Sequence, residues 1–258
     1  MRERTIIIGD VHGMLDELQS LIALLRPRVS DTLIFVGDLV DKGPQQASVV
    51  KFVRELREQD ACEIVLVEGN HEDKHRRYRR NLLDRPEVAR TQALAAPELP
   101  ILTRELSDAD VPFLEAAVPF HRVEKHNLLV VHGGIPGDMR AFPDSVETAT
   151  ALSGKARKSF YQILRTRYLD KATGRALVLG AEAVDDPFWA DRYDGRFGHV
   201  VFGHQPFLDG PSSFPHATGV DTGAVHGGGL TALIYSSDGA RSFETVPSRR
   251  IVPPRVDG

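Results

Sequence analysis

The chain has 258 residues, of which 41% are hydrophobic and 26% charged, and its formal net charge is −4. This length favours one large domain or two small ones, and the slight acidic excess argues against a broad nucleic-acid-binding surface. Cys62 is the only cysteine, which excludes an intrachain disulfide. Because no apolar run is long enough for a secretory signal or a membrane span, we expect a cytoplasmic protein without a membrane partner.

Five short apolar runs each end beside a glycine and a residue of metal-binding type. They cover residues 6–8, 33–36, 64–67, 128–131 and 200–202. Aliphatic and β-branched runs that a glycine closes are typical of buried strands. Since open α/β sheets bind ligands at the carboxyl ends of their strands, we expect the residues after these runs to meet at one edge.

The segments between the runs show helical spacing of apolar residues. Helices are predicted over 14–25 and 45–59, and this β-α-β-α-β order implies parallel pairing of the first three strands. A third helix is predicted over 72–83, and its basic run from Lys74 to Arg80 is interpreted as a solvated face.

The rest of the chain is predicted to add insertions and further strands. A first insertion at about 84–122 includes a short helix over 108–117, and a second at about 138–197 includes an amphipathic helix that ends near Tyr168. Strands are expected over 219–224, 230–235 and 242–246, and a loose tail over 247–258. The prediction is one α/β domain, residues 1–258, with helical insertions.

Six residues at the strand ends are candidate metal ligands. They are Asp10, His12, Asp38, Asn70, His132 and His204. On an extended strand end Asp10 and His12 point the same way, so they can bind one cation, and Asp38 can bridge it to a second. Carboxylate, imidazole and amide ligands suit manganese, iron, zinc or magnesium. Two such ions about 3.5–4 Å apart hold phosphate oxygens and activate a water, so the sequence predicts phosphate-ester hydrolysis.

Five other residues are candidates for catalysis and substrate binding. His71 follows Asn70 directly, so its side chain points elsewhere and suits a proton donor to the leaving oxygen. Asp41 is expected to hold that imidazole in the right tautomer. Lys42 and one or both of Arg165 and Arg167 are expected to neutralise phosphate oxygens.

The remaining histidines lack a comparable sequence context. Five of them are expected to have no function, namely His75, His121, His126, His199 and His216, while the role of His226 stays open. A single histidine at a strand end is usually structural. Five successive strand ends with ligand-type residues at the same place are hard to explain by turns, so we interpret the whole set as a metal centre.

Three segments resemble the signature blocks of the calcineurin-like metallophosphoesterases. They are GDVHG at 9–13, GDLVDKG at 37–43 and GNHE at 69–72, supported by His132-Gly133-Gly134 and Gly203-His204. The resemblance implies a four-layer α/β/β/α sandwich and a dinuclear site. It also implies manganese as the metal of bacterial members, with iron, zinc, cobalt or magnesium as alternatives.

The blocks resemble one branch of that family, the phosphoprotein phosphatases and bacterial symmetrical diadenosine tetraphosphatases. Segments 165–168 and 219–231 resemble the tetraphosphatases, Asp41 and Glu72 resemble the protein phosphatases, and Lys42 stands where arginine is usual. The leading expectation is symmetrical hydrolysis of diadenosine tetraphosphate to two ADP. A protein serine/threonine phosphatase and an RNA-end phosphatase are the alternatives. An inactive scaffold is disfavoured, because every ligand and the proton donor are present.

Overall fold

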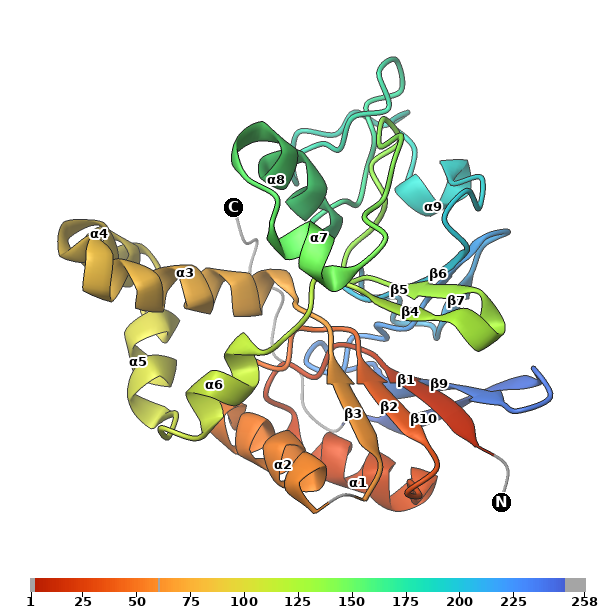
Figure 1. Cartoon of the computed structure of the whole chain (residues 1–258), viewed down its shortest axis with the longest axis horizontal. Coiled ribbons are helices and arrows are strands. Elements are labelled where there is room, and N and C mark those ends of the chain that lie inside the picture. The colour runs from red at the N-terminus through yellow and green to blue at the C-terminus, as the bar shows by residue number, and fades with distance from the viewer. Residues whose placement is uncertain (1–2, 60, 249–258) are drawn as a thin grey trace.

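Two five-stranded sheets form the framework of the computed structural model, which describes residues 3–59 and 61–248 (Figure 1). The first has the order β10-β9-β1-β2-β3, built from β1 (Arg4–Ile8), β2 (Thr32–Phe35), β3 (Glu63–Leu66), β9 (Gly229–Ser236) and β10 (Arg241–Pro247). The second has the order β4-β5-β6-β8-β7, built from β4 (His121–Val123), β5 (Leu128–Val130), β6 (His199–Phe202), β7 (Ser212–Ser213) and β8 (Ala217–Gly219). Strands β1, β2 and β3 are parallel, as the alternation with helices predicts.

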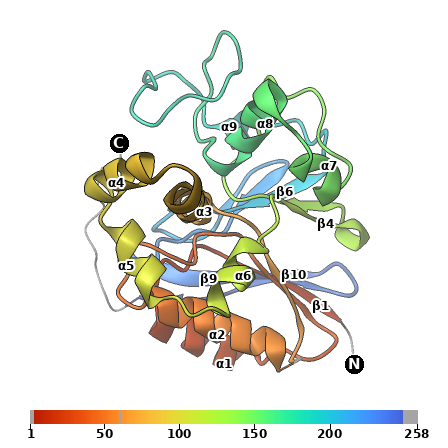
Figure 2. The ribbon, with the colours of Figure 1, turned by 60° about the vertical axis from the view of Figure 1, so that its left-hand side comes forward.

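Helices cover the outer face of each sheet. Helices α1 (Leu15–Leu25) and α2 (Gln46–Glu58) lie below the first sheet in Figure 1. Helices α7 (Val146–Thr150), α8 (Gly154–Phe160) and α9 (Trp189–Arg192) lie on the far side of the second sheet, and the view in Figure 2 agrees. The expected α/β/β/α sandwich is therefore confirmed.

The alternation of side chains along the strands builds three apolar layers. In β1, Ile6 and Ile8 pack against α1 and α2, whereas Ile7 points into the space between the sheets. In β5, Leu128 points into that same space, whereas Leu129 belongs to the outer apolar layer together with Trp189 of α9. The strands read as continuous apolar runs because both of their faces are buried.

The first insertion is a helical arm beside the strand ends (Figures 1 and 2). It follows α3 (Asn70–Asp84) and contains α4 (Pro86–Ala95), α5 (Glu98–Glu105) and α6 (Asp110–Glu115). Helix α3 begins at Asn70, two residues earlier than predicted. Among the described residues, no helix is long and apolar enough to span a bilayer.

Three boundary predictions were wrong in detail. The strand expected over 219–224 ends at Gly219, because the carboxylate of Asp221 accepts the Gly223 N–H and turns the chain. The helix expected to end near Tyr168 is α8 plus a 3-10 helix (Tyr161–Leu164), whose Ile163 carbonyl accepts two N–H groups from the loop after β5. The tail was expected from 247, but Pro247 is the last residue of β10, and residues 249–258 of the expected tail lie outside the described residues.

One buried carboxylate ties the ends of β2 and β3 together. The side chain of Glu72, in the first turn of α3, accepts the N–H groups of Asp38 (2.8 Å), Leu39 (2.8 Å) and Gly69 (2.9 Å). Burial, with the nearby Asp38 carboxylate, raises the pKa of Glu72 to about 7. Glu72 thereby fixes the loop that presents Asp38.

We expect Glu72→Gln to destabilise the metal-free fold by about 1–3 kcal/mol, because the new NH2 group would replace one of the two accepting oxygens and face a backbone N–H that it cannot accept. Urea unfolding at pH 8 with a chelator present measures this, since bound metal would otherwise add stability. Glu58→Gln is the matched control on an exposed ion pair with Arg54, with an expected change within about 0.5 kcal/mol. Equal stability of the two variants would contradict the role assigned to Glu72.

Candidate metal centre

The six predicted ligands meet where strand ends of both sheets converge. Asp10, His12, Asp38 and Asn70 follow β1, β2 and β3 of the first sheet, whereas His132 and His204 follow β5 and β6 of the second. The ligands do come together as expected, but at the adjoining edges of two packed sheets and not at the edge of one sheet. Most of these side chains are buried, and Asn70 and His204 are half-buried.

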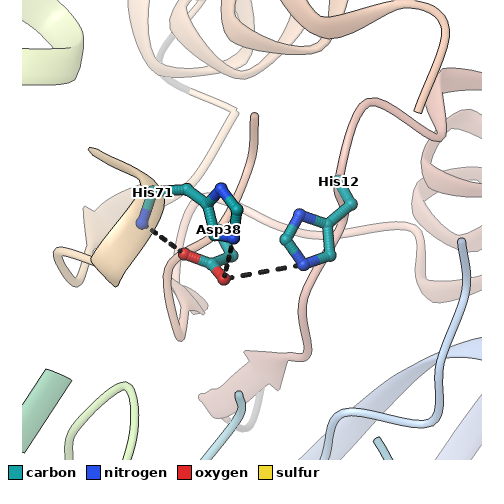
Figure 3. A group of neighbouring side chains, drawn as sticks. All are labelled: His12, Asp38 and His71. Atoms are coloured by element: carbon teal, nitrogen blue, oxygen red, sulfur yellow. Dashed lines mark hydrogen bonds and ion pairs between the residues drawn. The ribbon is translucent and has the colours of Figure 1, made fainter. Parts of the chain in front are cut away.

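Asp38 belongs to two groups of side chains that could each hold a metal ion. One group is His12, Asp38 and His71, and the other is Asp38, His132 and His204; within each, the ligand atoms lie within 4.8 Å of one another. The Oδ2 atom of Asp38 is 3.5 Å from His12 Nε2 and 3.2 Å from His132 Nε2. Figure 3 shows Asp38 between His12 and His71. A carboxylate shared in this way is placed to bridge two cations.

Backbone carbonyls set the tautomers of two of these histidines. Nδ1 of His12 lies 2.8 Å from the Val40 carbonyl oxygen, and Nδ1 of His132 lies 3.0 Å from that of Val36. A carbonyl oxygen only accepts, so the neutral rings carry their proton on Nδ1 and turn a bare Nε2 inward. Burial also lowers the pKa of His12 well below its usual value, which favours the neutral form.

The donor set fits a divalent cation. His132 Nε2 lies 2.9 Å from Asn70 Oδ1 and 3.2 Å from Asp38 Oδ2. With the His132 proton on Nδ1, the atoms His132 Nε2, Asn70 Oδ1 and Asp38 Oδ2 are three electron-pair donors that face one another with no hydrogen atom between them. A cation at that point would satisfy all three, and nitrogen with oxygen donors suits the divalent metals considered above.

Asp10 is buried next to the two groups but belongs to neither of them. Its carboxylate accepts the N–H of His204, at 3.0 Å from Oδ2, and Oδ2 is 3.9 Å from His12 Nε2. Burial raises the pKa of Asp10 well above its usual value, and the nearby negative charges of Asp221 and Asp38 add to this. Burial likewise raises the pKa of Asp221, so positive charge at this place would favour the ionised forms of Asp10 and Asp221.

The backbone of the centre adopts conformations that side chains rarely allow. Five residues of the centre have φ between 47° and 67°, namely His12, Asp38, Asp41, Lys42 and His204. Such left-handed residues cost of order 1–3 kcal/mol each and cluster at functional sites. The strain aims these side chains inward from turns instead of along regular strands.

His71 and Asp41 form a close pair beside Asp38. His71 Nδ1 donates to Asp41 Oδ2 at 2.5 Å, and its Nε2 is 3.8 Å from Asp38 Oδ2. Hydrogen bonds from His71 and His75 outweigh burial and hold the pKa of Asp41 far below its usual value. The ring therefore turns one nitrogen to Asp41 and the other to the centre, closer to the ligands than the sequence suggested.

The three predicted phosphate-binding cations lie at different depths. Lys42 Nζ is inside the centre, 3.1 Å from His12 Nε2. Arg167 donates to the carbonyl oxygen of His204 at 2.6 Å, and its buried Nε has no hydrogen-bond partner among the described residues. The half-exposed Arg165 lies at the rim, where it pairs with Asp73 at 2.9 Å.

One interpretation of α3 was wrong, and one histidine of this helix makes a contact that the sequence did not indicate. The run from Lys74 to Arg80 is not a uniformly solvated face, because Lys74 pairs with Asp41, Arg76 with the buried Glu68 and Arg79 with Glu115. His75, expected to have no function, is fully buried and donates to Asp41 Oδ1 at 2.7 Å. The available signal was its spacing of four residues from His71, which places both on one helix face.

Comparison with known proteins agrees with this geometry. The model of the calcineurin-like phosphoesterase family matches residues 3–235, and the chain belongs to that family. The bis(5'-nucleosyl)-tetraphosphatase PrpE (asymmetrical) of Oceanobacillus iheyensis is 27% identical, covering 95% of this chain and 92% of that protein. The protein of the same name from Bacillus velezensis is 30% identical, covering 93% and 92%.

Two solved structures share the fold. A candidate diadenosine tetraphosphatase superposes with a TM-score of 0.65 at 26% identity, covering 95% of this chain and 93% of the other. A protein serine/threonine phosphatase of Saccharomyces cerevisiae superposes with a TM-score of 0.63 at 16% identity, covering 98% and 81%. The second likeness establishes the fold alone.

We expect Asp38→Asn to lose metal from both positions and to keep less than about a tenth of the wild-type rate, a barrier change of at least about 1.4 kcal/mol. The physical reason is that one carboxylate serves both ligand groups. Metal analysis after gel filtration in Mn²⁺, together with an aryl phosphate assay, measures both effects. Asp194→Asn is the control, because Asp194 pairs with Arg196 at the surface, and an Asp38 variant matching it would refute a bridging role.

Proposed function

We propose that this phosphoesterase hydrolyses dinucleoside tetraphosphates and cleaves them asymmetrically, giving ATP and AMP from diadenosine tetraphosphate. The observation that carries the phosphohydrolase chemistry is the Asp38 carboxylate shared by two ligand groups, with His71 held beside it. The choice of substrate is supported by the relatives named asymmetrical tetraphosphatases, which match almost the whole chain. The symmetrical cleavage expected from the sequence is the alternative that product analysis decides.

The six predicted ligands are the residues that would hold two divalent ions. Asp10 and His12 would serve one position and Asn70, His132 and His204 the other, with Asp38 between them. When bound, the ions would activate water and neutralise phosphate oxygens as Lewis acids. Manganese is the proposed metal, because the family resemblance implies it for bacterial members. The donor set would also suit iron, zinc, cobalt or magnesium.

His71 is the proposed proton donor to the leaving group. The N–H at Nδ1 of His71 donates a hydrogen bond to Asp41. Nε2 is therefore the nitrogen that faces the centre and can carry a second proton. In asymmetric cleavage the bond from the first phosphorus to its bridging oxygen breaks, and that oxygen leaves with ATP. Protonation of this oxygen by His71 would lower the barrier of bond cleavage.

Three cations would bind the phosphates of the substrate. Lys42 reaches into the centre and would neutralise the reacting phosphate as a point charge. Arg165 is accessible at the rim, so it can leave Asp73 for a flanking phosphate. Arg167 is tied to the backbone of His204, so it would act on a phosphate through the charge of its guanidinium group. Flanking cations of this kind would set which phosphorus lies in line for attack.

A protein serine/threonine phosphatase is the second candidate. The observation that favours it is the pair of Asp41 with His71, together with Glu72 in the GNHE segment, as the family resemblance implies for that branch. An RNA-end phosphatase uses the same chemistry. All three substrates can be offered to one preparation, so the rates kcat/KM compare them directly.

We expect His71→Asn to lower kcat by roughly 10²–10⁴-fold, the usual contribution of a positioned acid. The loss should shrink for 4-nitrophenyl phosphate, whose leaving group needs little protonation. Two metal ions should remain bound, and metal analysis of the variant checks this. Loss of one ion would instead make His71 a ligand, as its place in the His12–Asp38 group allows.

The regiochemistry is decided by the first products. We expect chromatography of early time points with Mn²⁺ and diadenosine tetraphosphate to show ATP and AMP in equal amounts. The His71→Asn variant, purified in parallel, controls for contaminating hydrolases. Two ADP as the early product would establish the symmetrical alternative, and fast phosphopeptide hydrolysis without nucleotide products would favour the protein phosphatase.

A further inference from the structure

One face of α3 encloses the carboxylate of Asp41. His71, Lys74 and His75 occupy positions i, i+3 and i+4 of this helix, so their side chains lie side by side. His71 Nδ1 and Lys74 Nζ contact Oδ2 at 2.5 and 2.6 Å, and His75 Nε2 contacts Oδ1 at 2.7 Å. Both oxygens of a residue that is 2% exposed are therefore bound by one helix face.

His75 contributes a contact that no other described residue makes. It is the hydrogen-bond donor to Oδ1, whereas Oδ2 has two partners. The His75 ring is fully buried, and its Nδ1 has no hydrogen-bond partner within residues 3–59 and 61–248. Since the Asp41 carboxylate only accepts, the proton of the neutral ring sits on Nε2.

Lys74 connects the same carboxylate to the helical arm. Its ammonium group contacts Asp41 Oδ2 and also Glu98 of α5, at 2.9 Å. The Asp41–Lys74 pair is largely shielded from water, and burying such charges costs free energy that a well-packed apolar pair would not. A buried ion pair is therefore weak evidence for stability, and what this network does is fix the orientation of its members.

We propose that His75, supported by Lys74, is a positioning residue that acts on the reaction through Asp41 and His71. By holding Oδ1, His75 prevents the carboxylate from rotating away from His71 Nδ1, so the imidazole keeps Nε2 towards the centre. Without that contact the His71 ring could turn about its broad terminal torsion. This inference rests on the proposed role of His71 as proton donor.

The test compares leaving groups in the full-length, Mn²⁺-loaded protein. We expect His75→Leu to lower kcat for phenyl phosphate by about 10–100-fold, the usual effect of losing an orienting partner, with KM unchanged. The loss should be smaller for 4-nitrophenyl phosphate. His75→Gln retains a side-chain N–H for Asp41 Oδ1 and should restore most of the rate. His199→Leu is the matched control, because the His199 ring bonds Thr218 away from the centre.

A double-mutant cycle separates positioning from general support of the fold. In the His71→Asn background, His75→Leu should cost no further activity, because the group that it positions is gone. The same fold-loss in both backgrounds, or an equal loss with both esters, would overturn the proposal. If His75→Leu does not fold by circular dichroism, Lys74→Met must show the leaving-group pattern, and its absence is also contradictory. Full activity of His71→Asn would overturn the proposed proton donor itself, which is a distinguishable result.

Discussion

The buried carboxylate of Asp38 is the interaction on which the site depends. It is 1% exposed and lies within 4 Å of ring nitrogens of His12, His71 and His132. An ionised carboxylate with little solvent needs cationic partners, and the convergence of strand ends from two sheets supplies the ligands that recruit them.

The motif glycines exist because the backbone approaches these carboxylates closely. A Cβ on Gly69 would lie 2.1 Å from Asp38 Oδ1, and a Cβ on Gly203 would lie 2.0 Å from Asp10 Oδ1. Glycine at these two positions therefore leaves room for the carboxylate that follows a neighbouring strand. Glu72 then fixes the spacing between the loops after β2 and β3.

The strands and the ligand set follow from local sequence, whereas the network behind them does not. Runs such as 33–36 are apolar because both faces are buried, and the polar residues after them are conspicuous for that reason. His75 carries no such contrast, since it stands in a basic helical run, and its contact with Asp41 depends on how α3 packs against the loop after β2. The depths of Lys42, Arg165 and Arg167 likewise depend on tertiary packing.

Anomalous diffraction from crystals loaded with Mn²⁺ tests the central claim most directly. The account predicts two anomalous peaks on either side of the Asp38 carboxylate, about 3.5–4 Å apart as in other two-metal sites. One peak should have His12 and Asp10 as neighbours, and the other His132, His204 and Asn70. A single peak, or two peaks that do not share Asp38, would contradict a bridging carboxylate and the dinuclear chemistry built on it.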